Sequence, residues 1–241
     1  MKKNKKECDL KSCFLCKLCL PEWLPAVAAN KKIFHFKKGE NIFKEGKVVK
    51  GIYFVYDGTV KVHKKWGDEK ELIIRFAKNG DIFGHRGLGE EVIYPVSGTA
   101  IEATTACFVD LEFFKKTLKV NNDFTISLLM FYADELQRSE RKMNNLAHMQ
   151  VKGRIAYSLL SLFNKFGVTA DGAINIILSR QDLASYAGTT YETVFRILNE
   201  FIQDEIITIE NKNIFIQNIA KLEYLVVPQK VTNGRCSGVV V

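Results

Sequence analysis

The sequence lacks any stretch that could anchor or export the chain. No run approaches the roughly 20 consecutive apolar residues that a membrane-spanning helix needs. The basic N-terminus is interrupted by Asp9, Lys11, Lys17 and Glu22, so it has no apolar centre like that of a signal peptide. We therefore expect a cytoplasmic protein without a membrane partner. Thiols stay reduced in that compartment, so the six cysteines are expected to bind metal or to react rather than to form a disulfide framework.

Groupings of catalytic residues are missing as well. We find no nucleophile–base set, no phosphate-binding glycine loop and no carboxylate pair, so nothing in the sequence favours an enzyme. No repeat of solenoid length is visible. The 241-residue chain has an ordinary globular composition, with 47% hydrophobic and 26% charged residues. Its net charge of +8 favours a nucleic-acid partner, because phosphate contacts dominate the affinity of such complexes.

Cysteines are concentrated near the N-terminus, at Cys8, Cys13, Cys16 and Cys19. The spacing Cys13-x2-Cys16-x2-Cys19 lets several thiolates converge on one metal centre from a single short loop, as in iron–sulfur clusters. Zinc held by four cysteines is an alternative, and reactive thiols without a metal are another. An iron–sulfur electron carrier of the ferredoxin type would place a further cysteine before a proline shortly after the third. Here Leu20-Pro21 follows Cys19 directly, which argues against such a carrier.

Residues 31–110 predict short strands separated by glycine turns, a pattern that indicates a small barrel or roll. The turns are expected at Gly39-Glu40, Glu45-Gly46, Asp57-Gly58, Trp66-Gly67-Asp68 and Asn79-Gly80-Asp81. The strands are expected over Ile33–Phe36, Asn41–Phe43, Gly51–Tyr56, Thr59–His63, Leu72–Phe76, Thr99–Ala103 and Ala106–Leu111.

From Leu118 the apolar spacing changes to three and four residues, which predicts a helix of about 28 residues. That length and spacing are typical of a coiled-coil seam, so we expect this helix to pair with the same helix of a second subunit. The predicted seam consists of Ile126, Leu129, Ala133, Leu136, Glu140, Met143, Ala147 and Gln150. Glu140 fits poorly there, because two carboxylates facing each other would weaken a dimer.

The segment Ser179–Phe201 predicts two short helices joined by a tight turn. Ser179, with Asp182 three residues on, can cap the first helix; Gly188 supplies the turn, and Thr189 or Thr190 caps the second. The residues expected to face inward are Leu183, Ala184, Ala187, Val194, Ile197, Leu198 and Phe201.

The opposite face of the second helix carries residues that packing does not explain, namely Tyr191, Glu192, Phe195, Arg196 and Asn199. In the major groove an arginine can read guanine and a glutamate can accept a hydrogen bond from cytosine, so this face predicts a DNA reader. The alternative is a surface ion pair between Glu192 and Arg196.

The flanking segments complete a winged form of this motif. A helix is expected over Arg154–Phe166, and strands over Ile206–Ile209 and Ile214–Ile216 flank Asn211-Lys212-Asn213 as a hairpin. The predicted division is a cysteine-rich segment 1–30, a β-roll sensor domain 31–117, a dimerisation helix 118–150, a winged helix-turn-helix domain 151–228 and a loose tail 229–241.

In this order the chain resembles the Crp/Fnr family of bacterial transcription regulators over roughly residues 30–225. The turns Gly39-Glu40, Phe43-x-Glu45-Gly46, Tyr53-x-Val55-x-x-Gly58 and Gly80-Asp81-x-Phe83-Gly84 match the family's roll, and Glu192-Thr193-Val194 with Arg196 matches its recognition helix. The resemblance implies an α+β fold: an N-terminal antiparallel β-roll like a cyclic-nucleotide-binding domain, a long dimerisation helix and a C-terminal winged helix-turn-helix.

The resemblance also implies how DNA is recognised. A homodimer working with RNA polymerase would bind a pseudo-palindromic double-stranded site whose half-sites lie about one helical turn apart. Glu192 and Arg196 would contact a GA-containing core of each half-site. The other predicted DNA-binding residues are Tyr191, Phe195, Thr190 and Arg180.

Members that bind cyclic AMP hold its ribose with a Glu after the Phe-Gly pair and its phosphate with an Arg-Ser pair. Here His85 follows Phe83-Gly84, and Ser97-Gly98 stands where Arg-Ser is expected. Without that arginine the phosphate loses its fixed positive charge, so we expect no cyclic AMP. An alternative signal is haem, or another small ligand in the roll, with His85 rather than His35, His63 or His148 as the imidazole of interest.

The oxygen-sensing branch, typified by the fumarate and nitrate reduction regulator (Fnr), binds a [4Fe–4S] cluster through three N-terminal cysteines and one in the roll. Residues 100–107 resemble the strand that carries the fourth ligand, which implies Cys13, Cys16, Cys19 and Cys107 as ligands. Leu10 stands where that branch has its first cysteine, so Cys8 is an alternative to Cys16. Cys107 could instead be an ordinary buried cysteine. The predicted function is a transcription regulator controlled by a cluster sensitive to oxygen or nitric oxide.

Overall fold

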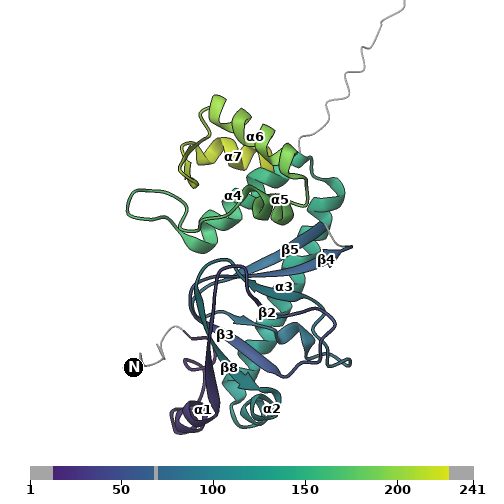
Figure 1. The fold of residues 1–241 in the computed structure, drawn as a ribbon, viewed down its shortest axis with the longest axis vertical. Coiled ribbons are helices and arrows are strands. Elements are labelled where there is room, and N and C mark those ends of the chain that lie inside the picture. Colours follow the sequence, from purple (N-terminus) through teal and green to yellow (C-terminus); the bar gives the residue numbers. More distant parts are fainter. Residues whose placement is uncertain (1–12, 68–69, 228–241) are drawn as a thin grey trace, which may run out of the picture.

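The computed structural model describes residues 13–67 and 70–227. A β-roll occupies one end of the molecule and a helical domain the other, and one long helix runs between them (Figure 1). Cys8, Leu10, Cys236 and the predicted tail 229–241 lie outside the described residues, as do residues 68–69 of one predicted turn.

The roll consists of two four-stranded antiparallel sheets. The first has the order β1 (Lys31–Phe36), β8 (Thr104–Asp110), β3 (Gly51–Asp57) and β6 (Ile82–Phe83). The second has the order β2 (Asn41–Phe43), β7 (Ser97–Ala100), β4 (Val60–Trp66) and β5 (Lys70–Ala77). All seven predicted strands are present, although several begin or end elsewhere than predicted. The two-residue β6 was not predicted, because so short a strand leaves no alternating pattern.

Glycine allows the tight turn between β3 and β4. Gly58 has a φ of +95°, and a Cβ atom added there would lie 2.7 Å from the carbonyl oxygen of Ala103. A larger residue would therefore meet both backbone strain and a steric clash. The prediction of a turn at Asp57-Gly58 is confirmed.

Two helices at the base of the roll were not predicted, α1 (Leu24–Asn30) and α2 (Leu111–Val120). The Asp110 side chain caps α2 by accepting a hydrogen bond from the Phe113 amide at 2.9 Å. The prediction that Leu111 ends a strand and that the long helix starts at Leu118 is wrong on both points. Asn121 separates α2 from the long helix, with a φ of −112° and a ψ of 86°, which are not helical values.

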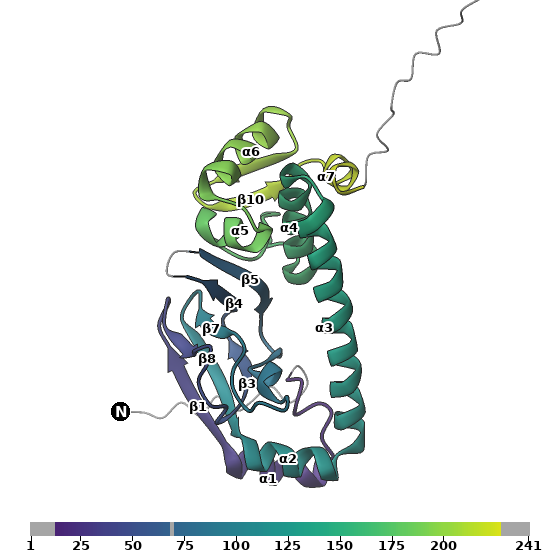
Figure 2. The same cartoon turned by 90° about the vertical axis from the view of Figure 1, so that its right-hand side faces the viewer.

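The long helix α3 spans Asn122–His148, 27 residues, and stands beside the roll (Figure 2). Its buried side faces the roll through Phe124, Leu128 and Glu135. Every predicted seam residue is exposed on the single chain, namely Ile126, Leu129, Ala133, Leu136, Glu140, Met143, Ala147 and Gln150. The glutamate that this helix buries is therefore Glu135 and not Glu140. Within the described parts of the chain, no helix combines the length and the apolar character needed to cross a membrane.

The C-terminal domain contains α4 (Val151–Phe166), α5 (Arg180–Ala187), α6 (Tyr191–Gln203), the hairpin β9 (Ile207–Glu210) and β10 (Asn213–Ile216), and α7 (Ile219–Val226). The predicted hairpin is confirmed, α4 starts three residues before its predicted start at Arg154, and α7 was not predicted. One apolar core joins this domain to the roll, since Ile73, Phe76 and Ile101 belong to the same buried cluster as Ile197 and Phe201. The domain is thus packed against β5 rather than tethered only by α3.

Candidate functional site

Local hydrogen bonds define the two-helix unit α5–α6. The Ser179 hydroxyl accepts from the Asp182 amide at 3.0 Å, and the Thr190 hydroxyl accepts from the Thr193 amide at 3.3 Å. Between the helices Gly188 has a φ of 66° and a ψ of 48°, the left-handed conformation that glycine adopts most readily. The predicted caps and turn are confirmed, with Thr190 as the cap of α6.

The inner faces of these helices form the core predicted from the spacing. Leu183, Ala184 and Ala187 of α5 and Val194, Ile197, Leu198 and Phe201 of α6 are all buried. This packing fixes the orientation of α6, so its other face is held toward solvent as a rigid surface.

The predicted DNA-binding residues lie together on that surface. Tyr191 and Phe195 are 42% and 43% exposed, large values for aromatic side chains. Glu192, Arg196 and Thr190 are also exposed. The guanidinium of Arg180, from α5, lies 5.0 Å from the centre of the Phe195 ring. We define these six residues as the α6 face.

The alternative of a Glu192–Arg196 ion pair does not occur. Arg196 instead pairs with Glu200 one turn further along, at 2.5 Å. Glu200 also pairs with Lys152 of α4, at 3.1 Å. The pKa of Glu192 is lowered by hydrogen bonds from its own backbone N–H and from the Thr190 side chain. Glu192 is therefore an ionised acceptor at the start of α6 that no intrahelical cation neutralises.

The four described cysteines lie in one buried cluster at the other end of the molecule. Cys13, Cys16 and Cys19 come from the loop 13–19, and Cys107 comes from β8; each is less than 9% exposed. Burial and then the neighbouring Cys13 raise the pKa of the Cys19 thiol to about 11. Cys8, the alternative ligand, lies outside the described residues.

The donor set suits an iron–sulfur or zinc centre, because thiolates are preferred ligands of both. In the described part of the chain, however, no group of three or more His, Cys, Asp or Glu side chains is arranged to hold a metal ion. The thiols thus share a cluster with Phe14 and Val27 but would have to draw closer together to share a metal.

Aromatic rings lie next to the two glycines at the position that the resemblance assigns to a nucleotide. The rings of Phe43 and Tyr94 stack with centroids 4.3 Å apart. A Cβ atom added to Gly98 would lie 2.8 Å from the Phe43 ring, and one added to Gly84 would lie 3.4 Å from Phe43, Tyr53 and Tyr94. The two glycines therefore face side chains of the protein itself.

His85 is buried next to this aromatic group, at 2% exposure, and packs against Phe131 and Tyr132 of α3. Burial, followed by the charges of Arg75 and Arg86, lowers the pKa of His85 well below its ordinary value, so the ring is neutral. Neither ring nitrogen has a hydrogen-bond partner in the described protein. The other imidazoles behave as ordinary polar groups: His63 contacts Thr99 and Glu71, and His35 contacts Thr105.

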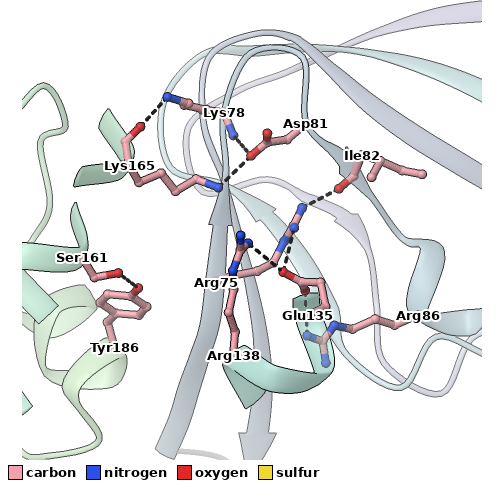
Figure 3. A network of polar contacts seen from close by, with 10 residues as sticks. All are labelled: Arg75, Lys78, Asp81, Ile82, Arg86, Glu135, Arg138, Ser161, Lys165 and Tyr186. Atoms are coloured by element: carbon pink, nitrogen blue, oxygen red, sulfur yellow. Dashed lines mark hydrogen bonds and ion pairs between the residues drawn. The ribbon is translucent and has the colours of Figure 1, made fainter. Parts of the chain in front are cut away.

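Sequence reasoning missed the polar contacts that hold the long helix and the C-terminal domain to the roll (Figure 3). Glu135 of α3 binds Arg75 at 3.3 Å and Arg86 at 2.9 Å. Lys165 of α4 binds Asp81 at 2.8 Å. Glu135 could have been recognised from its position on the inner side of α3, seven residues after Leu128. A carboxylate buried at such a position requires a partner.

A third contact joins the roll directly to the helix-turn-helix. Lys61 of β4 binds Asp182 of α5 at 2.9 Å and Glu71 of β5 at 2.5 Å. The Asp182 carboxylate also accepts a hydrogen bond from the Ser179 hydroxyl at 2.6 Å, so the side chain that docks α5 on the roll also holds the residue that caps this helix. The pairs Lys61–Asp182 and Lys165–Asp81 lie on different helices of the C-terminal domain and together restrain its orientation.

Comparison with known proteins identifies both parts of the chain. Residues 33–121 match a cyclic nucleotide-binding domain, and residues 153–225 match a Crp-like helix-turn-helix domain. The chain is 30% identical over 188 residues to the cAMP-activated global transcriptional regulator CRP of Pasteurella multocida, covering 76% of this chain and 89% of that protein. It is 28% identical over 209 residues to an anaerobic regulatory protein of Bacillus subtilis, covering 86% of each. The structure of FixK2 from Bradyrhizobium japonicum superposes with a TM-score of 0.74 at 25% identity, covering 83% of this chain and 99% of that one.

Proposed function

Because this chain belongs to the Crp/Fnr family of DNA-binding transcription regulators, we propose that it acts as a homodimer whose DNA affinity is controlled by a [4Fe–4S] cluster on its cysteines. The family accounts for DNA binding and transcription control. The dimer, the residues that read DNA and the cysteine-based signal are our inferences. The observation that carries the signal is the burial of Cys13, Cys16, Cys19 and Cys107 in a single cluster.

The α6 face supplies the DNA-reading residues. Arg196 has a long exposed side chain held only by Glu200, an acceptor that DNA bases can replace. Glu192 remains ionised beside it and can accept from a cytosine amino group. Tyr191 and Phe195 are exposed and would offer apolar surface to thymine methyl groups, and Thr190 and Arg180 would contact the DNA backbone.

Dimerisation rests on the exposed apolar side of α3. Leu129, Leu136 and Met143 are 67%, 61% and 62% exposed in the single chain. Rows of large apolar side chains at three- and four-residue spacing lose that exposure when two helices pair. Pairing would place two α6 faces on one side of the dimer, which favours a pseudo-palindromic DNA site. RNA polymerase would be the further partner of the DNA-bound dimer.

The cysteine loop is connected to both parts of the protein that a signal must reach. The Phe14 amide donates to the Gly80 carbonyl at 2.9 Å, and the next residue, Asp81, binds Lys165 of the C-terminal domain at 2.8 Å. The Phe14 ring also packs on Phe124 and Phe131 of α3, with centroids 5.9 and 5.4 Å apart. We infer that a change in the loop would reach the dimer helix through the Phe14 ring and the DNA-binding domain through Gly80 and Asp81.

The cluster, when bound, would supply a link between the loop and β8 that oxygen or nitric oxide can destroy. Residues of the chain itself would supply the other contacts of the loop. Cys13, Cys16 and Cys19 would bind the cluster from the loop side and Cys107 from the roll, and Leu20 connects the loop to the start of α3, because its amide donates to the Asn121 side chain at 2.8 Å. Loss of the link would release both contacts and shift the population between DNA-binding and weaker-binding forms.

The roll would transmit this signal without cyclic AMP. The protein's own rings, those of Phe43 and Tyr94, occupy the space beside Gly84 and Gly98. Arg86, the cation nearest to Gly84 in sequence, is engaged by Glu135. Calorimetric titration with cyclic AMP should give no binding heat; tighter DNA binding on addition of cyclic AMP would contradict this part of the proposal.

The decisive experiment compares protein prepared with and without oxygen. Wild type purified anaerobically should contain iron and sulfide in equal amounts, absorb in the visible range and bind its DNA more tightly than the aerobic protein. Cys107→Ala should lose most of the iron, whereas Cys236→Ala should keep it. A thermal melt separates ligand loss from unfolding. Equal DNA binding by both preparations, with iron in neither, would rule out the cluster.

A further inference from the structure

A large cavity lies between the roll and the helix-turn-helix domain. Its volume is about 860 Å³, within the range of about 300–1,000 Å³ typical of small-molecule sites. On the roll side it is lined by the Lys38-Gly39 turn and by Ile101, and on the other side by α5, α6 and the hairpin. None of the four described cysteines lines it, so it is separate from the proposed cluster.

The inner wall of this cavity is apolar. Ile101, Leu183 and Leu198 are among its lining residues and are less than 10% exposed overall. Ile177 also lines the cavity yet is 59% exposed, so it stands at the mouth rather than in the core. An apolar chain bound along this wall would remove further hydrocarbon surface from water, which favours binding.

The charges around the cavity are mostly positive. Its lining contains four cations, Lys38, Lys61, Arg180 and Lys212, and a single carboxylate, Asp182. That carboxylate is already paired with Lys61 at 2.9 Å. Lys38, Arg180 and Lys212 line the cavity and are exposed, so none of these three cations is buried in the core. A ligand with one negative group would be complementary to this rim.

We propose that the cavity binds a medium-chain carboxylate, with its hydrocarbon chain against Ile101 and Leu198 and its carboxylate among Lys38, Arg180 and Lys212. Two of the lining residues, Arg180 and Tyr191, belong to the α6 face. A ligand that engages them competes with their contacts to DNA and also bridges the roll to the helix-turn-helix. The carboxylate therefore lowers the affinity for DNA, and DNA lowers the affinity for the carboxylate by the same factor.

Binding is tested by isothermal titration of the full-length protein with decanoate and with 1-decanol, which has the same chain and no charge. Decanoate should bind more tightly than decanol. Lys38→Gln should weaken decanoate binding about fivefold, as expected for the loss of one partly exposed charge pair. Lys37→Gln is the matched control, because Lys37 is an exposed neighbour that does not line the cavity.

A second variant places a negative charge at the cavity mouth. Ile177→Glu should weaken decanoate binding more than about tenfold, because the two carboxylates would repel each other. Ile219→Glu is its control: Ile219 is 42% exposed in the same domain and lies outside the cavity lining. Both substituted side chains are on the surface, and thermal melts verify that the variants are folded.

The coupling to DNA is measured by fluorescence anisotropy of a labelled duplex selected for binding, at constant salt. Saturating decanoate should raise the dissociation constant of the wild-type complex at least about fivefold, the lower end of typical coupling, and that of Ile177→Glu much less. The proposal is overturned if decanoate shows no binding at concentrations up to about 1 mM, because a much larger dissociation constant does not imply a specific site. Equal binding by wild type, Lys38→Gln and Ile177→Glu, equal binding of decanol, or an unchanged DNA affinity would also overturn it.

Discussion

Replacing Glu135 by glutamine tests whether the long helix is held to the roll by charge. Glu135 is 6% exposed and binds Arg75 and Arg86, which come from different parts of the roll. Glutamine keeps the shape of the side chain but leaves three arginines near an uncharged group, since Arg138 also lies 3.6 Å from the carboxylate. Removing one partner of a fully buried ion pair costs about 3–5 kcal/mol. The Arg86 side chain is 25% exposed and can be partly hydrated, so we expect Glu135→Gln to lower the free energy of unfolding by about 3 kcal/mol at pH 7.

The pH dependence of this loss has a definite sign. Burial alone would raise the pKa of Glu135, but the charges and hydrogen bonds of Arg75 and Arg86 outweigh it and hold the pKa below its ordinary value of 4.5. The unfolded chain thus binds this proton more readily than the folded chain. The stabilisation is present above the unfolded pKa and is lost as the pH falls through the folded pKa. The difference between wild type and Glu135→Gln should therefore shrink in acid.

Urea unfolding followed by circular dichroism at fixed protein concentration, at pH 7 and at about pH 3, measures both effects. Glu140→Gln is the control, because Glu140 lies on the same helix and is exposed; its effect should stay within about 0.5 kcal/mol. If Glu135→Gln unfolds at the wild-type urea concentration at pH 7, or if its deficit is unchanged in acid, the assigned role of this network is wrong.

Three further substitutions test other parts of the structure. Arg196→Ala should weaken specific DNA binding by about 1–3 kcal/mol in anisotropy titrations and relax the preference at one base position, with an unchanged melting temperature. The role of Arg196 would be contradicted if wild type and the variant had the same affinity for every base at every position. Leu129→Asp should convert dimer to monomer in sedimentation equilibrium, whereas Val120→Asp, equally a surface change but outside the seam, should not. Burial lowers the pKa of Lys142 to about 8, so the charged form of this side chain destabilises the fold. The stability of the wild type should therefore rise between pH 8 and the unfolded pKa near 10.5. Lys142→Met removes this titration, together with the contacts of Lys142 with the Ile73 carbonyl and the Tyr186 ring, so the stability of the variant should not rise over that pH range.

Much of the fold follows from local patterns. The Ser179 and Thr190 caps, the Gly188 turn and the inward spacing of Val194 and Phe201 were predictable, because each depends on residues within one or two helical turns. The strands of the roll were recognisable for a similar reason, since glycine turns separate them. The ends of these strands were harder to recognise. Leu111, for example, continues an apolar strand pattern but begins α2 after the Asp110 cap.

The candidate site likewise contains a part that could be predicted from local patterns and a part that could not. The exposure of the α6 face could be predicted, because its residues lie within one short segment, 180–196, and their spacing places them opposite the apolar residues of the helices. The Arg75–Glu135 and Lys61–Asp182 contacts could not, since 60 and 121 residues separate the partners and nothing local marks either as paired. The interdomain cavity was equally beyond prediction, because its walls come from the roll, from helices of the C-terminal domain and from the hairpin.

The sequence by itself determined the seven main strands of the roll, the helix-turn-helix with its hairpin, the family resemblance, the exposed face of α6 that we propose as the DNA reader, and the unusual supply of cysteines. Tertiary structure decided which side of α3 is buried, that Glu135 rather than Glu140 is enclosed, and that Cys107 of β8 lies in the same cluster as the loop cysteines. It also decided that the helix-turn-helix is docked on the roll through Asp182 and Lys165. The physical reason is range: caps, turns and periodicity depend on neighbours along the chain, whereas burial and charge pairing depend on elements that only folding brings together.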